Sequence, residues 1–201
     1  MTREMFSRLA AALAVLLTMS TLGAATVTRQ QADVFVRKLS EIAKPNPPAV
    51  RPGLRRTPVT EGELNSWFAF RAQPLLPAGL SDPQITILGD GKVAGQAVVD
   101  FDAISKKKTS GSTIDPWRLV GGRVPVNVTG TLQTQKGVGR FELESADVAG
   151  VPVPKALLQE MVGMYSRSDK SPQGVRLDDP FTLPANIQQI ELGQGRAVIV
   201  Q

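Results

Sequence analysis

Polar and apolar residues alternate over a long central stretch of the chain, Gln84–Ile104. After Gly89-Asp90-Gly91, the apolar or small positions are Val93, Gly95, Ala97, Val99, Phe101 and Ala103, and the polar ones are Lys92, Gln96, Asp100 and Asp102. Successive side chains of a strand point to opposite faces of its sheet, so this period of two predicts a long strand with one apolar face, ending near Ile104. Ile85-Thr86-Ile87 alternates too, and a Gly-Asp-Gly connection supplies the positive φ angles of a tight hairpin.

Further strands follow downstream. Arg123–Gln133 alternates, with Val124, Val126, Val128, Gly130 and Leu132 on one face. Gly139–Ala149 returns with Phe141 and Leu143 on one face, but Asp147 and Val148 break the alternation, which a β-bulge would explain. Pro125 cannot donate to a ladder, so it indicates an edge position or a strand start. Ile187–Leu192 and Arg196–Val200 flank Gly193-Gln194-Gly195 and predict a final hairpin.

Helices are predicted before and between these strands. Thr28-Arg29-Gln30-Gln31 is a capping box for a helix over Arg29–Ala43, whose apolar stripe we expect to face the core; the alternative is a helix that binds a membrane surface. Thr60-Glu61-Gly62-Glu63 is a second capping box, followed by Leu64, Trp67 and Phe68. Pro154 fits the first turn of a third helix that runs to Tyr165. The prolines of Lys44–Pro58 predict a semi-rigid basic linker.

These patterns predict an α+β fold in which a curved antiparallel sheet, built from long hairpins, packs on one or two amphipathic helices. We expect a signal peptide over residues 1–25, an N-terminal amphipathic helix with a proline-rich basic linker over residues 26–58, and the sheet-plus-helix domain over residues 59–201.

The first residues have the features of an export signal. Arg3 and Arg8 precede the apolar run Leu9–Leu17, and Gly23 and Ala25 suit a signal-peptidase site. We therefore expect cleavage after Ala25 and a periplasmic or secreted bacterial protein. An uncleaved membrane anchor is the alternative interpretation.

The composition removes most catalytic chemistry. The chain contains no cysteine and no histidine, which excludes disulfides, thiolate nucleophiles and the commonest zinc ligands and general bases. Paired carboxylates remain, as in Asp100/Asp102 and Glu142/Glu144, but we expect them on solvated sheet faces. The sequence therefore predicts a protein that is not an enzyme, with no catalytic residue, metal or cofactor.

The formal net charge is +5, and two basic clusters contribute to it. Arg51, Arg55 and Arg56 form one, and Lys106, Lys107 and Lys108 form the other. A solvated surface is the simplest interpretation. The sharper hypothesis is that Lys106–Lys108 contacts an anionic membrane surface. Export and the lack of an aromatic platform argue against nucleic acid as a partner.

The chain also resembles a known family. A helix that begins at Thr60–Asn65 (Thr-x-x-Glu-Leu-Asn), long hairpins, a helix after Val-Pro-Val-Pro and a final hairpin occur in this order. This order resembles the bacterial single-domain exported members of the tubular lipid-binding (TULIP) superfamily, over about Val59–Gln201. The resemblance implies a strongly curved sheet that wraps a helix and leaves an apolar groove for lipid. The chain differs from many such relatives in lacking a lipobox cysteine.

We therefore expect an exported protein that binds a lipid or another apolar small molecule in a groove. The predicted lining is Trp67, Phe68, Val93, Ala97, Val99, Phe101, Val126, Val128, Phe141, Leu143, Leu158 and Met161. The alternative function is a non-enzymatic structural or adaptor protein of the envelope, with a closed core and a protein partner.

Overall fold

The computed structural model describes residues 26–44, 55–106, 122–166 and 172–201. The predicted signal peptide, residues 45–54 of the predicted linker, and Lys107 and Lys108 lie outside the described residues. The helices are α2 (Arg29–Ala43), α3 (Glu61–Phe70), the 3₁₀ turn η1 (Gln73–Leu75), α4 (Phe101–Lys106) and α5 (Lys155–Tyr165). The strands are β1 (Arg56–Thr60), β2 (Leu80–Gly89), β3 (Lys92–Asp100), β4 (Arg123–Gln135), β5 (Val138–Val148), β6 (Val151–Pro152), β7 (Phe181–Thr182), β8 (Gln189–Gly193) and β9 (Arg196–Val200).

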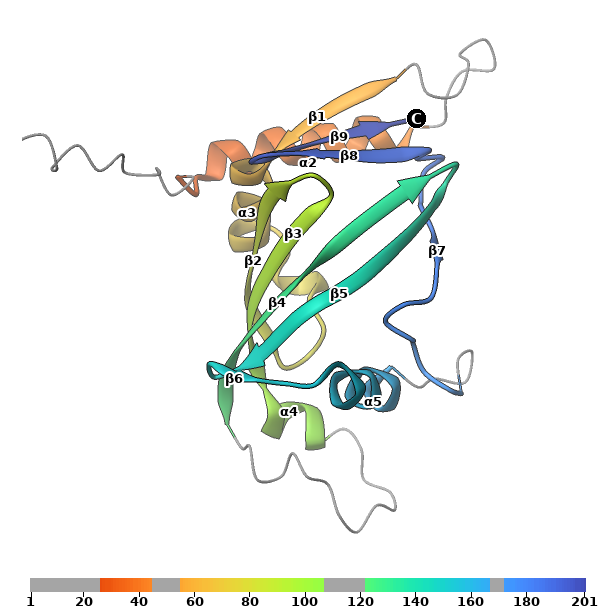
Figure 1. Cartoon of the computed structure of the whole chain (residues 1–201). Helices are drawn as coiled ribbons and strands as arrows, with labels where there is room; N and C mark the ends of the chain where they lie inside the picture. The colour runs from red at the N-terminus through yellow and green to blue at the C-terminus, as the bar shows by residue number, and fades with distance from the viewer. Residues whose placement is uncertain (1–25, 45–54, 107–121, 167–171) are drawn as a thin grey trace, which may run out of the picture.

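Two antiparallel sheets organise these elements. The larger sheet has six strands in the order β2-β3-β4-β5-β6, with β7 paired to β5, and the smaller has three in the order β1-β9-β8. The smaller sheet lies with α2 and α3 at one end of the long strands, whereas α4 and α5 lie at the other end (Figure 1). The predicted α+β class, with a large antiparallel sheet and packed helices, is confirmed.

The central hairpin forms where the alternation predicted it, but its second strand is shorter. Asp90 and Gly91 make the turn with φ angles of 50° and 78°. β3 ends at Asp100, and α4 begins at Phe101, so the prediction that this strand continues to Ile104 is wrong. The Asp100 carboxylate accepts a hydrogen bond from the backbone N–H of Ala103 at 2.8 Å. This local side-chain bond favours a helical turn over the ladder.

The β4–β5 hairpin contains the predicted bulge. Thr129 pairs with Ser145, but the next residue, Gly130, pairs with Leu143, so Glu144 is the extra residue of β5. Beyond it Ala146 and Val148 are buried, as Leu143 is. The extra residue explains why the sequence alternation changes phase in this strand.

The two predicted capping boxes have different outcomes. Around α3 the box is complete, because Thr60 and Glu63 each bind the other's backbone N–H. At α2 only half of it forms: the Thr28 hydroxyl accepts from the Gln31 N–H at 3.2 Å. The Gln31 side chain instead accepts a hydrogen bond from Ser66 at 3.0 Å. Since Ser66 is fully buried on α3, this glutamine joins the two helices.

A short strand replaces the end of the predicted linker. Arg56–Thr60 forms β1 and pairs with β9, with Pro58 opposite Val198. β1 lies at the edge of the smaller sheet, where a missing N–H is tolerated. The linker interpretation is therefore wrong for residues 56–58.

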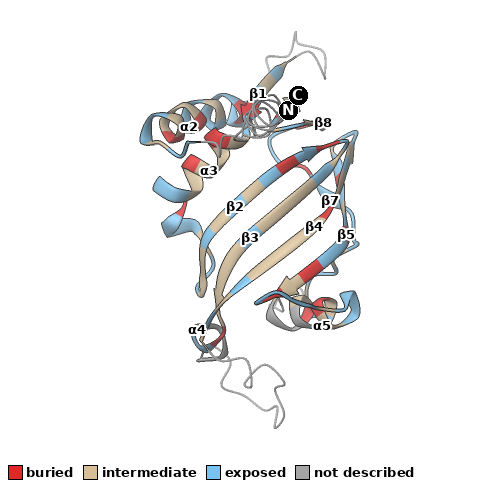
Figure 2. Ribbon diagram, turned by 60° about the vertical axis from the view of Figure 1, so that its left-hand side comes forward, coloured by how far each residue is buried: buried red, intermediate tan, exposed pale blue. Residues whose placement is uncertain are grey.

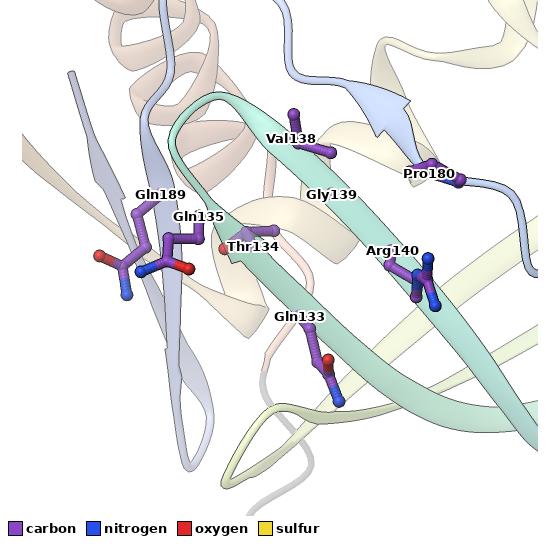
Figure 3. A pocket seen from close by; sticks show the side chains of 8 residues that line it. All are labelled: Gln133, Thr134, Gln135, Val138, Gly139, Arg140, Pro180 and Gln189. Carbon is purple, nitrogen blue, oxygen red and sulfur yellow. The ribbon is translucent and has the colours of Figure 1, made fainter.

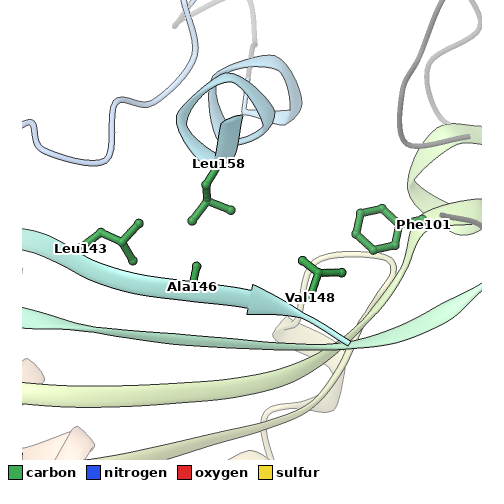
Figure 4. Packing of buried hydrophobic residues seen from close by; sticks show 5 residues of the cluster. All are labelled: Phe101, Leu143, Ala146, Val148 and Leu158. Atoms are coloured by element: carbon green, nitrogen blue, oxygen red, sulfur yellow. The ribbon is translucent and has the colours of Figure 1, made fainter. Parts of the chain in front are cut away.

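Two clusters of buried apolar residues hold the elements together. One consists of Ile42, Leu183 and Ile187, and it joins the end of α2 to the smaller sheet through Ile190 and Ile199. The other consists of Phe101, Leu143, Ala146, Val148 and Leu158, and it lies between β5, α4 and α5 (Figure 4). The second cluster contains part of the predicted groove.

Candidate functional site

The candidate site is one face of the larger sheet. Residues directly opposite each other in an antiparallel sheet point to the same face, so the register defines rows of neighbours. One row is Ile87, Val93, Gly130 and Leu143, the next is Ile85, Gly95, Val128 and Ala146, and a third is Ala97, Val126 and Val148. These three rows form one face that is apolar from β2 to β5, the apolar face of the larger sheet.

Burial changes across the apolar face. On β5, Leu143, Ala146 and Val148 are buried, and Figure 4 shows Leu158 of α5 pointing toward Leu143 and Ala146. On β3, Val93 and Ala97 are only partly buried, and most of β3 and β4 has intermediate burial in Figure 2. One half of the face is thus covered by α5, while the other half keeps partial access to solvent.

Most of the predicted groove residues come together in this region. Val99, Phe101, Val126, Val128, Phe141, Leu143 and Leu158 belong to one hydrophobic cluster. Val93 and Ala97 lie farther along the same face in the register with β4. Phe101 is 2% exposed although it leaves the strand, and it points toward Val148 in Figure 4.

Other predicted residues lie elsewhere. Trp67 packs edge-on against Phe35 of α2, with 5.7 Å between ring centroids, and Phe68 lies 5.2 Å from Trp67. These rings belong to the contact between α2 and α3. Met161 is on α5 and Lys106 ends α4, but their side chains lie outside the described part of the structure.

Neighbouring side chains occupy much of the space next to two glycines of the apolar face, Gly130 and Gly95. A Cβ on Gly130 would lie 2.5 Å from the ring of Phe141, and one on Gly95 would lie 3.2 Å from a methyl of Val128. Phe141 therefore covers Gly130, and Val128 partly covers Gly95. Val93 and Ala97, on the same face of β3, are half-buried.

The motif Thr60–Asn65 acts on the edge of the larger sheet. The Asn65 side chain donates to the Ile85 carbonyl and accepts from the Ile85 N–H, both at 2.8 Å. The Glu61 carboxylate accepts from the Ile87 N–H at 2.8 Å. Residues four apart on a helix are about 5–6 Å apart, close to the repeat of about 7 Å between alternate strand residues. The motif therefore satisfies backbone groups of β2, an edge strand.

The spacing of residues in the sequence carries a signal for this contact. Glu61 and Asn65 are spaced for one helix face, and Ile85 and Ile87 for one strand edge. Alternation identifies a strand but does not say which strand lies at the edge, so the partner of the motif could not be named.

The described residues offer neither a metal-binding cluster nor a membrane-spanning helix. They contain no group of three or more His, Cys, Asp or Glu residues that could hold a metal ion. Among the same residues, no helix combines the length and the apolar character needed to cross a membrane.

Comparisons with known proteins do not assign a family. No protein-family model matches the chain, and neither the curated proteins nor the solved structures give a significant match.

Proposed function

We propose that this protein binds a lipid or another apolar small molecule on the apolar face of its larger sheet, in the bacterial periplasm or outside the cell. The observation that supports the proposal is the partial burial of the apolar side chains of β3, Val93, Ala97 and Val99, next to a covered half at β5. Apolar surface that is continuous but only partly covered is typical of a binding surface.

Export and the family resemblance are part of the same proposal. The export signal that ends near Ala25 would bring the mature protein, beginning at Thr26, to a compartment next to lipid. A large antiparallel sheet with packed helices is compatible with a TULIP-like lipid-binding protein.

Binding would be driven by the apolar surface that the ligand and the protein remove from water. At roughly 25 cal/mol per Å² of apolar surface, an acyl chain that buries a few hundred Å² gains several kcal/mol without any polar contact. Such a site discriminates poorly between headgroups, so we expect broad selectivity for chain-like apolar ligands.

A second candidate function is a structural or adaptor role in the envelope, with a protein partner. The observation in its favour is that Phe141 fills the space over Gly130, and Val128 part of the space over Gly95. A face closed in this way would stabilise the fold and leave recognition to the surface.

Ala97→Trp tests the first proposal. A tryptophan at this half-buried position would cover the partly exposed surface of β3, so we expect binding of a fluorescent fatty acid to be lost while the circular dichroism spectrum is retained. The matched control is Gln96→Trp, because Gln96 is exposed and the adjacent residue of the same strand. If the wild-type protein binds no lipid and none co-purifies in native mass spectrometry, the adaptor function is favoured.

Membrane contact through Lys106, Lys107 and Lys108 is a separate part of the proposal. Each basic residue near an anionic surface is worth about 1 kcal/mol. Changing all three to glutamate should slow lipid transfer to anionic vesicles but not to neutral ones, and high salt should have the same effect on the wild-type protein.

A further inference from the structure

A hollow that is separate from the apolar face lies at the tip of the β4–β5 hairpin. Its volume is about 440 Å³, and its walls come from the ends of β4 and β5, from Pro180 before β7 and from Gln189 on β8 (Figure 3). This volume is within the usual range of small-molecule sites, about 300–1,000 Å³.

The walls of this hollow combine polar side chains with apolar surface from Val138 and Pro180. Gln133, Gln135 and Gln189 contribute primary amides and Arg140 contributes a guanidinium group, and no acidic residue lines it. Gln133 and Arg140 are directly opposite each other on β4 and β5, so their side chains share a face. Among the described residues, these four side chains make no hydrogen bond or ion pair. Their donors and acceptors are therefore available to a ligand.

The backbone around the hollow is held by several contacts. The Thr134 hydroxyl bonds both the carbonyl and the N–H of Ile190, at 3.0 and 2.8 Å. A Cβ on Gly139 would lie 2.6 Å from the ring of Phe181, so β5 and β7 are in close contact. The hollow is thus held in place by β7 and β8, and a ligand would order little backbone on binding.

We propose that this hollow binds an acidic saccharide. A primary amide both donates and accepts hydrogen bonds, as sugar hydroxyls do, so Gln133, Gln135 and Gln189 suit a hydroxyl-rich ligand. The fork of N–H groups on Arg140 matches a carboxylate in two parallel hydrogen bonds. A single cation among three amides favours a ligand whose hydroxyls outnumber its carboxylates over a compact multivalent anion.

The test is isothermal titration of the full mature chain with trigalacturonate. Maltotriose is the neutral comparison ligand, and inorganic phosphate is the compact anion. We expect saturable binding of trigalacturonate, with much weaker binding of the other two. Arg140→Gln should weaken trigalacturonate binding by about tenfold or more, as expected for the loss of a charge-assisted hydrogen bond, and Gln189→Ala should weaken it less.

Arg37→Gln is the matched control. Arg37 is an exposed arginine on α2, so its loss makes the same change in net charge away from the hollow. An unchanged affinity in Arg37→Gln supports the proposal. An equal loss in both arginine variants, equal binding of maltotriose or phosphate, or no binding of trigalacturonate would overturn it. None of these results depends on lipid binding at the apolar face.

Discussion

Asn65 takes the place of a neighbouring strand for Ile85. Its side-chain amide both donates to the Ile85 carbonyl and accepts from the Ile85 N–H, each at 2.8 Å. An amide side chain has the same donor and acceptor pair as a peptide group, so one residue of α3 satisfies an otherwise open position on the edge of the sheet. The contact also fixes α3, and with it α2, on the larger sheet.

Asn65→Leu should therefore destabilise the fold. Leucine has the same number and branching of side-chain heavy atoms but leaves the N–H and C=O of Ile85 without partners, and we expect a loss of about 2–3 kcal/mol in the free energy of unfolding. Urea unfolding followed by circular dichroism measures it. Gln84→Ala, at an exposed neighbouring position on β2, should change stability by less than about 0.5 kcal/mol. Equal effects of the two changes would refute the role given to Asn65.

Phe101 and Asp100 should contribute to the free energy of unfolding by different amounts and for different reasons. Phe101→Asp places an unpaired charge in the cluster with Leu143 and Leu158, so we expect a loss of several kcal/mol. Asp100→Ala removes the acceptor of the Ala103 N–H and should destabilise the protein by about 1 kcal/mol, as at other helix caps. Thermal or urea unfolding of both variants checks the order. A neutral Asp100→Ala would mean that α4 does not need this bond.

The two glycines of the apolar face provide a matched pair. A Cβ on Gly130 would lie 2.4 Å from the carbonyl oxygen of Glu142, whereas the closest atom to one on Gly95 is a Val128 methyl at 3.2 Å. Backbone cannot move as easily as a methyl group, so Gly130→Ala should destabilise by about 1–3 kcal/mol and Gly95→Ala by clearly less. The midpoints of urea unfolding distinguish these outcomes, and the opposite order would show that the register of β4 and β5 is different.

The pH dependence of stability should include a contribution from Glu144. Hydrogen bonds from the Thr131 hydroxyl and then from Lys92 lower the pKa of its carboxyl below the ordinary value of 4.5. A lowered pKa in the folded state stabilises the fold above the ordinary pKa, and this contribution is lost as the pH falls through the lowered value. The stability difference between wild type and Glu144→Gln should thus be present at pH 7 and vanish in acid. Unfolding curves between neutral and acidic pH test this, and a constant difference would contradict it.

Local patterns in the sequence predicted individual helices and strands. They did not predict which elements pack side by side. The period of two found the strands of the long hairpins, and the capping signals at Thr28 and Thr60 found the starts of α2 and α3. The end of β3 was predicted wrongly because the alternation does not reveal the hydrogen bond from the Ala103 N–H to Asp100, which favours a helical turn. β1 was missed because Pro58 argues against a strand unless the strand is known to lie at an edge.

The residues of the candidate site were likewise predicted where they depend on one strand pattern, and not where they depend on contacts between elements. Alternation placed Val126, Val128 and Phe141 on one face, and the structure brings them together. It could not show that Trp67 packs on Phe35, because a helical stripe does not specify which element covers it. The hollow at the hairpin tip could not be predicted from the sequence either. Gln133 and Gln189 belong to different sheets, and they line one hollow only because the two sheets lie next to each other.

The extra residue in β5 has a consequence for insertions and deletions in this strand. Because Thr129 pairs with Ser145 and Gly130 with Leu143, removing Glu144 would leave Leu143, Ala146 and Val148 alternating without interruption. The shortened strand keeps its buried side chains on the same face. It loses its bend, since a bulge increases local twist, together with the hydrogen bonds that Glu144 accepts from Thr131 and Lys92. The curvature of the sheet can therefore be altered by a one-residue change at an exposed position, separately from the composition of its interior.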